Sequence, residues 1–193
     1  MMPDSLGIKI DSTNLPIVFV ETHGNKFKRD AFVNVCVKII DNGDGQLNYG
    51  DTLAHPDQKV DFEGYMVMRH RGRSSYYGAT KKSYALRAID NESGKKKKSK
   101  LLGMRKDKKW ALKASYYDRS MIRDALTFEL ARNYMDFVPQ TRFCEVILNG
   151  VYQGVYCLSE QITANRLQLE KPGNNNVDIT GGYLLQLETH DIG

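Results

Sequence analysis

An Asn149-Gly150 pair between two runs of alternating apolar and polar residues constrains the fold of this chain more than any other feature. The runs cover residues 141–148 and 151–160. Asn-Gly is the pair most favoured in the two-residue type I′ turn that joins antiparallel strands, because both turn positions need a positive φ. The sequence therefore predicts a β-hairpin over residues 141–160.

The three cysteines give no disulfide framework, because their number is odd. Pairs counted outward from the Asn-Gly turn place Cys144 opposite Val155 and Cys157 opposite Arg142. The two thiols then point to opposite faces of the hairpin, which disfavours a bridge between them. Cys36 lies in another apolar run, and all three cysteines are predicted to be small, buried, hydrophobic residues.

Six further apolar runs have the length and composition of strands, and turn residues separate them. They cover residues 15–22, 31–40, 61–70, 83–89, 110–114 and 181–188. Alternation within the second of these runs predicts one core face, made of Val33, Val35, Val37 and Ile39. A chain of 193 residues is long enough to bury a substantial core as one domain.

One segment, from about residue 119 to residue 135, has the periodicity of a long helix. Ile122 and Leu126 recur at helical spacing, and Asp118 or Ser120 can accept the free N–H groups of the first turn. The sequence therefore predicts an α+β fold, in which a mainly antiparallel β-sheet carries one long helix packed on it. The first two strands are expected to form a second, small sheet.

The net charge of +5 comes largely from one run, Lys95 to Lys98 followed by Lys100. Such a run is either a solvated loop or a patch that binds an anionic partner. Aromatic residues do not interleave with it, so a single-strand stacking platform and a nucleic-acid partner are not expected. No stretch approaches the ~20 apolar residues of a membrane helix, and residues 1–20 lack the features of a signal peptide.

Residues 69–86, RHRGRSSYYGATKKSYAL, place a polar, glycine-containing turn between two strand-like runs. Serine and glycine let backbone N–H groups turn towards an anion, and arginine and lysine supply positive charge. A phosphate-binding loop is one interpretation, and a plain hairpin with a solvated basic tip is the other.

Residues 41–51 leave a similar choice between a calcium loop and a surface turn, although their match to an EF-hand is poor.

Four separated motifs follow one another in a characteristic order. RGRSS and KKSYAL come first, followed by WALKASYYDRSMIRD, EVILNGVYQGVYCLSEQI and GGYLLQLE. In this order they resemble the spore-coat-H (CotH) family over about residues 15–190. Some members are atypical protein kinases that are secreted or lie in the cell envelope, and others are modules of surface assemblies.

The resemblance implies a kinase N-lobe-like domain over residues 1–193, with residues 1–60 as a leading β segment. It implies ATP and Mg²⁺ as cofactors, transfer of phosphate to serine or threonine of a protein substrate, and an extracellular or cell-envelope location. The alternative is a non-catalytic surface module that binds protein or carbohydrate partners. In kinases the base, an asparagine and the metal-binding aspartate belong to the second lobe. This chain alone is therefore expected to contain no catalytic residue and to transfer no phosphate.

The resemblance also implies a set of nucleotide-binding residues. Lys82, or else Lys81, corresponds to the strand lysine that holds the nucleotide phosphates. Arg123 is a typical residue of the family, and it either contacts a phosphate or forms an ion pair with Glu160 or Asp118. Glu160 is either a structural or a metal-facing carboxylate. The full predicted set is Gly72, Arg73, Ser74, Ser75, Lys82, Arg123, Glu160 and Glu188, the last at the hinge that would meet the adenine.

Overall fold

The computed structural model describes residues 10–90, 93–170 and 181–185, which fall into two compact units, residues 1–161 and 162–193. All of its helices and strands lie in the first unit. They are β1 Ser12–Thr13, β2 Ile17–Glu21, β3 Val33–Ile40, β4 Asn48–Tyr49, β5 Val60–Arg71, α1 Ser74–Gly78, β6 Ser83–Ala88, β7 Lys109–Lys113, α2 Arg123–Ala131, β8 Thr141–Leu148 and β9 Val151–Glu160.

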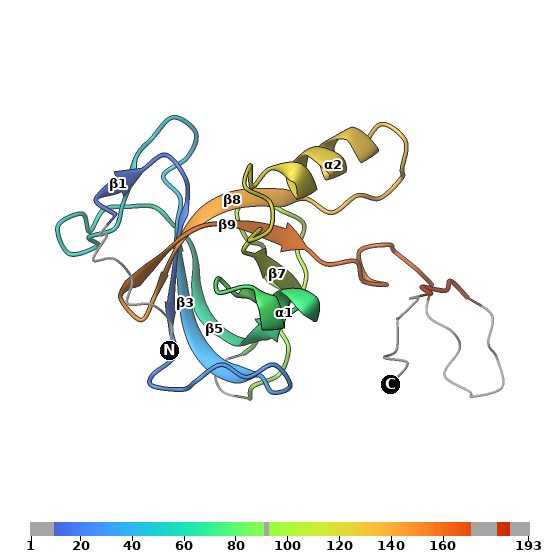
Figure 1. Cartoon of the computed structure of the whole chain (residues 1–193), viewed down its shortest axis with the longest axis horizontal. Helices are drawn as coiled ribbons and strands as arrows, with labels where there is room; N and C mark the ends of the chain where they lie inside the picture. Colours follow the sequence, from blue (N-terminus) through green and yellow to red (C-terminus); the bar gives the residue numbers. More distant parts are fainter. Residues whose placement is uncertain (1–9, 91–92, 171–180, 186–193) are drawn as a thin grey trace. The chain divides into compact units, whose positions relative to one another are not determined.

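Seven strands close into a β-barrel in the order β2-β3-β5-β6-β7-β9-β8 (Figure 1). All neighbours in the barrel pair antiparallel except β2 and β8, whose parallel pairing runs from Ile17 opposite Glu145 to Val20 opposite Leu148 and closes the ring. The short strands β1 and β4 form a separate two-stranded sheet. The predicted strands over residues 15–22, 31–40, 61–70, 83–89 and 110–114 are confirmed as β2, β3, β5, β6 and β7.

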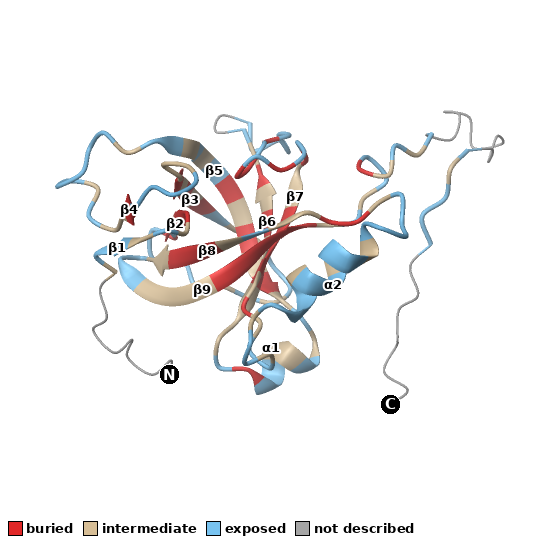
Figure 2. Cartoon of the chain, turned by 90° about the horizontal axis from the view of Figure 1, so that it is seen from above, coloured by how far each residue is buried: buried red, intermediate tan, exposed pale blue. Residues whose placement is uncertain are grey.

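Alternate side chains of the barrel strands fill its interior, and the buried stretches in Figure 2 follow these strands. The predicted core face of β3 is confirmed, since Val35, Val37 and Ile39 are buried. The largest buried side chains are Trp110, Tyr84 and Tyr156, which come from three different strands. The core is therefore made mainly by strand residues, and Leu101, Leu102 and Met104 of the β6–β7 connection complete it.

The predicted α+β fold with a long helix packed on the sheet is wrong. Helix α2 has nine residues, and none of them is buried. It starts late because Met121 has a positive φ of 60°, which a continuous α-helix does not allow. Because the barrel closes on itself and fills its own interior, no helix is needed to cover an open sheet, and α2 is exposed in Figure 2. The small second sheet is also made by other strands than expected, since β2 and β3 belong to the barrel.

The predicted hairpin is confirmed as β8 and β9, but its predicted register is wrong by one residue. Cys144 lies opposite Tyr156, and Cys157 lies opposite Phe143, because the pairing shifts between Val146 and Ile147. The thiols still point to different faces, and Cys144 and Cys157 are buried and free. Cys36 departs from expectation, since it is only half-buried.

The hairpin turn also contributes to closing the barrel. The Asn149 side chain accepts a hydrogen bond from Thr22 N at 2.8 Å and donates one to the Thr22 hydroxyl at 3.0 Å. Thr22 directly follows β2, so one turn residue holds together two segments that are 127 positions apart in the sequence. The side chain of Asn149 thus extends the β2–β8 pairing by one more set of polar contacts.

The second unit contains no strand among its described residues 162–170 and 181–185. The predicted strand over residues 181–188 is therefore wrong for residues 181–185, and its remainder, with Glu188, lies outside the described residues. Neither α1 nor α2, the helices of the described chain, is long and apolar enough to cross a membrane.

The contrast between core and helix is tested by one pair of leucine substitutions. Leu112→Ala removes a side chain with no exposed surface, and we expect it to lower the free energy of unfolding by about 3 kcal/mol. Leu126→Ala on α2, where the leucine is 52% exposed, is expected to cost less than about 0.5 kcal/mol. Urea denaturation of both variants measures this, and comparable losses would show that α2 is packed against the barrel.

Candidate functional site

A cavity of about 320 Å³ lies where β5 ends, β6 begins and β7 ends. These three termini meet at one end of the barrel because the strands pair antiparallel. Short segments after β5 and β7, together with the start of α2, complete the walls. The cavity is lined by Arg71, Gly72, Ser75, Ala79, Lys81, Ser83, Lys113, Ser115, Tyr116, Tyr117, Asp118 and Asp124.

Three cations from different strand termini line this cavity. Arg71 ends β5, Lys81 precedes β6 and Lys113 ends β7. Burial lowers the pKa of Lys81, and the nearby Glu145 carboxylate offsets this only in part. Burial also lowers the pKa of Arg71, although its guanidinium stays charged. Partly desolvated cations of this kind bind an anion more strongly than solvated ones.

Contacts with β9 fix the position of the Lys81 side chain. Its ammonium donates a hydrogen bond to the Val155 carbonyl at 2.5 Å and lies 4.3 Å from the centre of the Tyr156 ring. A Cβ at position 154 would lie 3.5 Å from this ammonium, which is an ordinary contact, and the φ of +82° is what favours glycine there. Lys81 therefore has a fixed position at the cavity wall before any ligand arrives.

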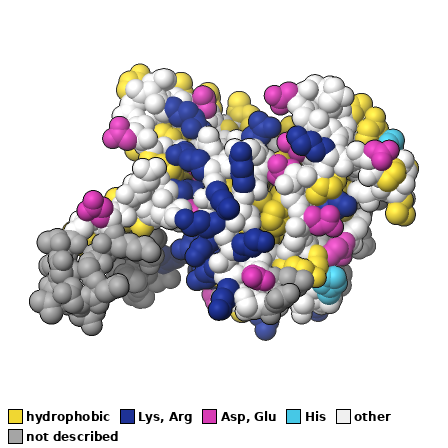
Figure 3. Space-filling model, turned by 180° about the vertical axis from the view of Figure 1, so that it is seen from behind, with side chains coloured by type: hydrophobic (Ala, Val, Ile, Leu, Met, Phe, Trp, Pro, Cys, Tyr) yellow, Lys and Arg dark blue, Asp and Glu magenta, His cyan; other side chains and the backbone are white. Residues whose placement is uncertain are grey.

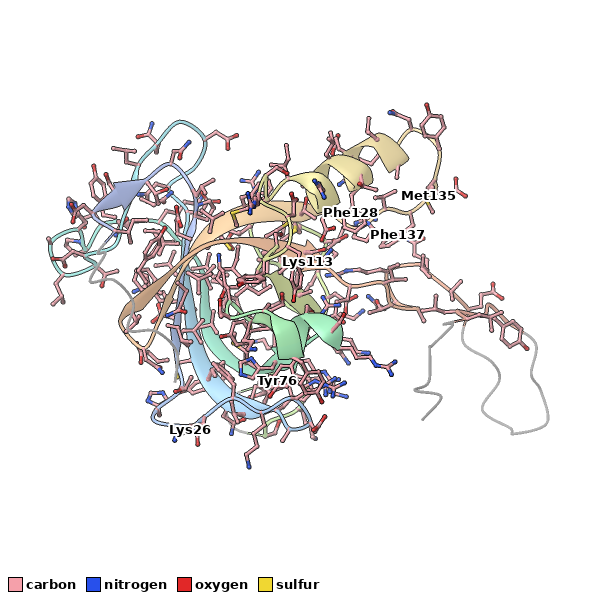
Figure 4. All side chains as sticks on the ribbon, in the orientation of Figure 1. Lys26, Tyr76, Lys113, Phe128, Met135 and Phe137 are labelled. Atoms are coloured by element: carbon pink, nitrogen blue, oxygen red, sulfur yellow. The ribbon has the colours of Figure 1, made fainter. Side chains whose placement is uncertain are left out.

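The two carboxylates of the cavity are already bonded to neighbouring groups. Asp124 pairs with Lys113 at 2.9 Å, and Lys113 also lies 4.8 Å from the ring of Phe128 on α2 (Figure 4). Asp118 accepts hydrogen bonds from the Ser120 hydroxyl at 2.6 Å and from Arg123 N at 2.9 Å. The Ser120 bond is the main reason that the pKa of Asp118 is lowered. This confirms Asp118 as a side chain that stabilises the start of the helix.

Gly72 begins the loop that the sequence marked as a phosphate-binding candidate. It has a φ of +100°, which favours glycine, and a Cβ there would force the Ser75 hydroxyl to move. Contrary to a plain loop, residues 74–78 form the short helix α1. Gly72 and Ser75 line the cavity, whereas Arg73 and Ser74 are not among its lining residues.

Lys82 stabilises this loop and is not among the residues that line the cavity. Its ammonium donates hydrogen bonds to the carbonyls of Tyr76 at 2.5 Å and Ala79 at 2.6 Å. These carbonyls belong to α1 and to the residue that follows it, so Lys82 ties α1 to the start of β6. Alternation along the chain sends Lys81 and Lys82 to different sides, and Lys81 is the one at the cavity.

An aromatic cluster behind α1 supports the same loop. His70 is buried and packs against Tyr84, with ring centres 5.2 Å apart, and against Tyr76 at 5.5 Å. Burial lowers the pKa of His70, and the nearby Lys82 ammonium lowers it further. The imidazole is therefore kept neutral near pH 7 and serves as a packing group between the core and α1.

Arg123 and Glu160 lie outside the lining of the cavity. Arg123 pairs with Asp118 at 3.4 Å, which is one of the two ion pairs expected for it, and its side chain is 79% exposed. Glu160 is buried, and its carboxylate accepts hydrogen bonds from the backbone N–H groups of Arg105 at 3.1 Å and Gln140 at 2.9 Å. The Arg105 side chain adds an ion pair at 3.2 Å. These contacts are those of a carboxylate that joins three segments of the fold.

Sequence reasoning missed several lining residues, above all Arg71, Lys113 and Asp124. A signal for the first two was available, because both lie within one residue of the ends of the predicted strands 61–70 and 110–114, which end on the same side. Asp124 was hidden, because its role depends on where α2 begins. No group of three or more His, Cys, Asp and Glu residues suited to a metal ion occurs in the described parts of the chain. The cavity lining combines three cations with two carboxylates.

Glu160→Gln tests the structural role of this carboxylate. We expect the free energy of unfolding to fall by about 2 kcal/mol, because the amide cannot accept both backbone N–H groups and loses the pairing with Arg105. Glu129→Gln, which alters an exposed ion pair with Arg132, is the control and should cost less than about 0.5 kcal/mol. Denaturant titration measures both values, and equal stabilities of Glu160→Gln and wild type would contradict this role.

The lowered pKa of Asp118 predicts a pH dependence at the start of α2. Because the folded-state value lies below the unfolded one, the stabilisation is present above the unfolded pKa and is lost as the pH falls through the folded value, below about pH 4. Nuclear magnetic resonance titration of the Asp118 carboxyl carbon measures it. Ser120→Ala should raise this pKa, whereas Ser93→Ala should leave it unchanged; a Ser120→Ala variant with an unchanged value would contradict the assignment.

Comparison with known proteins agrees with the family that the motifs suggested. No curated protein matches this sequence. The family model described as CotH kinase protein matches residues 68–191, which is more than half of the chain. The match begins inside β5 and includes every residue that lines the cavity. The chain belongs to the CotH family.

Proposed function

We propose that this chain is the nucleotide-phosphate-binding part of a CotH-like protein kinase that transfers phosphate from ATP to serine or threonine of a protein. The observation that carries the proposal is the convergence of Arg71, Lys81 and Lys113 on one cavity. Its two carboxylates already have partners, so a polyphosphate meets positive charge that is not fully compensated. Phosphoryl transfer depends mainly on positioning and on such electrostatic stabilisation.

Lys81 takes the role of the phosphate-holding lysine in this proposal, and Lys82 acts on the loop. Lys81 reaches the cavity wall from a fixed position, and its partial desolvation strengthens its attraction for a phosphate. Arg71 offers a planar fork suited to two phosphate oxygens. Gly72 and Ser75 shape the near wall, so that the backbone can approach the ligand closely.

We propose that Mg²⁺ enters this site already bound to the nucleotide phosphates, because the carboxylates of the cavity have partners in the protein. Asp118 and Asp124 are the carboxylates of the cavity, and each is bonded to a serine, an arginine or a lysine of the chain. Mg²⁺ is commonly bound by one or two carboxylates together with substrate phosphates. We therefore propose MgATP as the ligand, with the protein's own cations on the phosphate oxygens that the metal leaves exposed.

The test is a calorimetric titration with adenosine, AMP, ADP and ATP, each with Mg²⁺. Wild-type affinity should rise with the number of phosphates. Lys81→Met should weaken ATP binding by about tenfold, because it removes one charge-assisted contact. Its affinity should also increase less with each added phosphate than that of the wild type. Lys82→Met should keep the rise and lower the thermal stability, because it releases the α1 carbonyls.

Lys26→Met, which changes an exposed lysine away from the cavity, is the matched control and should bind like wild type. The proposal fails if Lys81→Met and Lys26→Met bind ATP equally well. It also fails if affinity is the same for adenosine and ATP, because the cavity cations then do not contact phosphate.

A second candidate function is a surface module without catalysis, which binds protein or carbohydrate. Exposed aromatic side chains near the cavity favour it: Tyr77, Tyr116 and Tyr117 are 71%, 44% and 64% exposed. Tyrosine is enriched where proteins contact partners. Absence of MgATP binding, together with loss of partner binding in Tyr117→Ala, would favour this function. Both candidates are consistent with the extracellular or cell-envelope location that we propose from the family.

A further inference from the structure

The connection between β6 and β7 concentrates the positive charge of the protein. Residues 89–108, which connect these strands, contain eight of the 28 lysines and arginines and three of the 23 acidic residues, a net charge of +5. The rest of the chain then has no net charge. Figure 3 shows Lys and Arg side chains gathered in a band on one face, with few acidic ones among them.

The lysines of this connection are held on a defined backbone. Lys97 N donates a hydrogen bond to the Ala88 carbonyl at 2.9 Å, and Ser99 pairs with Asp107. Lys95, Lys96 and Lys97 are exposed, and none of them makes an ion pair within the described chain. No carboxylate of the described residues therefore relieves their repulsion through an ion pair.

Two arginines on the neighbouring strands extend this charge over the barrel wall. Arg69 of β5 and Arg87 of β6 are diagonal neighbours on the outer face, since Arg87 pairs with Val67. Both guanidinium groups lie over the ring of Phe32, at 4.9 Å and 4.1 Å from its centre. Arg69 Nη1 donates a hydrogen bond to the Arg29 carbonyl at 3.0 Å, whereas its Nε is buried without a hydrogen-bond partner among the described residues. Burial lowers the pKa of Arg87, and the nearby Arg69 lowers it further. Two like charges are thus fixed next to each other.

These observations together indicate a ligand with several closely spaced negative charges. The arginine pair and residues 95–97 adjoin, because Lys97 N donates its hydrogen bond to the carbonyl of Ala88, the residue after Arg87. Residues 93–109 offer nucleobases no aromatic side chain, and Phe32 already carries two guanidinium groups, which leaves Tyr65 of β5, 40% exposed, as an aromatic ring on this face. Planar guanidinium groups bind phosphate oxygens in pairs.

We propose that this basic band, made of Arg69, Arg87 and Lys95 to Lys97, binds a linear polymer of phosphate or phosphodiester groups through contacts with its phosphate oxygens. The site is separate from the cavity, whose lining contains none of these residues. The polymer lies on the outer face of β5 and β6 and continues over the lysines. Its binding does not depend on the proposed nucleotide function.

The experiment measures the affinity of the full chain for long-chain inorganic polyphosphate at several salt concentrations. Arg87→Gln should weaken binding by about tenfold, because it removes one of the two paired guanidinium groups. The triple variant Lys95→Gln, Lys96→Gln, Lys97→Gln should reduce the slope of log affinity against log salt by about 2, since each phosphate contact contributes about 0.7. Circular dichroism and thermal unfolding establish that both variants are folded.

The control triple variant, Lys26→Gln, Lys38→Gln, Arg119→Gln, removes the same charge elsewhere and should keep the wild-type slope. An equal loss of polyphosphate affinity in the control variant, or equal binding of poly-glutamate, would overturn the proposal in favour of general charge attraction.

Loss of polyphosphate affinity in Lys81→Met would assign the polymer to the cavity. Tighter binding of oligo-deoxythymidine than of polyphosphate would assign the band to nucleic acid. Binding of orthophosphate as tight as that of the polymer would reduce the band to a single-anion site.

Discussion

The parallel pairing of β2 with β8 is the contact on which the rest of this structure depends. It joins Ile17 to Glu145 and Val20 to Leu148, and it turns an open seven-stranded sheet into a ring. An open sheet would leave two edges with unpaired backbone groups and one uncovered apolar face. Closure removes the edges and encloses the apolar side chains at once. The Asn149 side chain strengthens it by bonding to Thr22 on both its backbone and its hydroxyl.

Closure also explains where the candidate site can lie. Because the interior is filled by residues such as Trp110 and Tyr84, no ligand enters the barrel itself. The polar side chains at the ends of β5 and β7 and at the start of β6 face outward, and antiparallel pairing brings these termini together. The short helix α1, which Lys82 ties to β6, then covers one side of the space between them. A rigid ring thus positions cations that come from distant parts of the sequence.

Local patterns were enough to predict most strands, and long-range contacts were not. Alternation found β3 and its buried valines, and the Asn-Gly pair found β8 and β9. The same patterns could not show that β2 pairs with β8, because that contact joins residues more than 120 positions apart. The predicted register failed at the bulge beside Val146, which inserts one residue without any apolar signal. The helix was overestimated for a similar reason, since periodicity in residues 119–135 says nothing about whether a sheet is open to receive it.

The adjacent lysines show how far such reasoning reaches for the site. Alternation required that Lys81 and Lys82 point to different sides, but it could not say which side holds the cavity. That choice depends on α1, whose carbonyls accept both bonds from Lys82 and leave Lys81 at the cavity wall. The same distinction separates the two cationic regions of the protein. Lys81 and Arg71 are partly desolvated and suit a compact anion. Lys95 to Lys97 are exposed, so salt screens each of their contacts, and they suit a polymer that makes many such contacts at once.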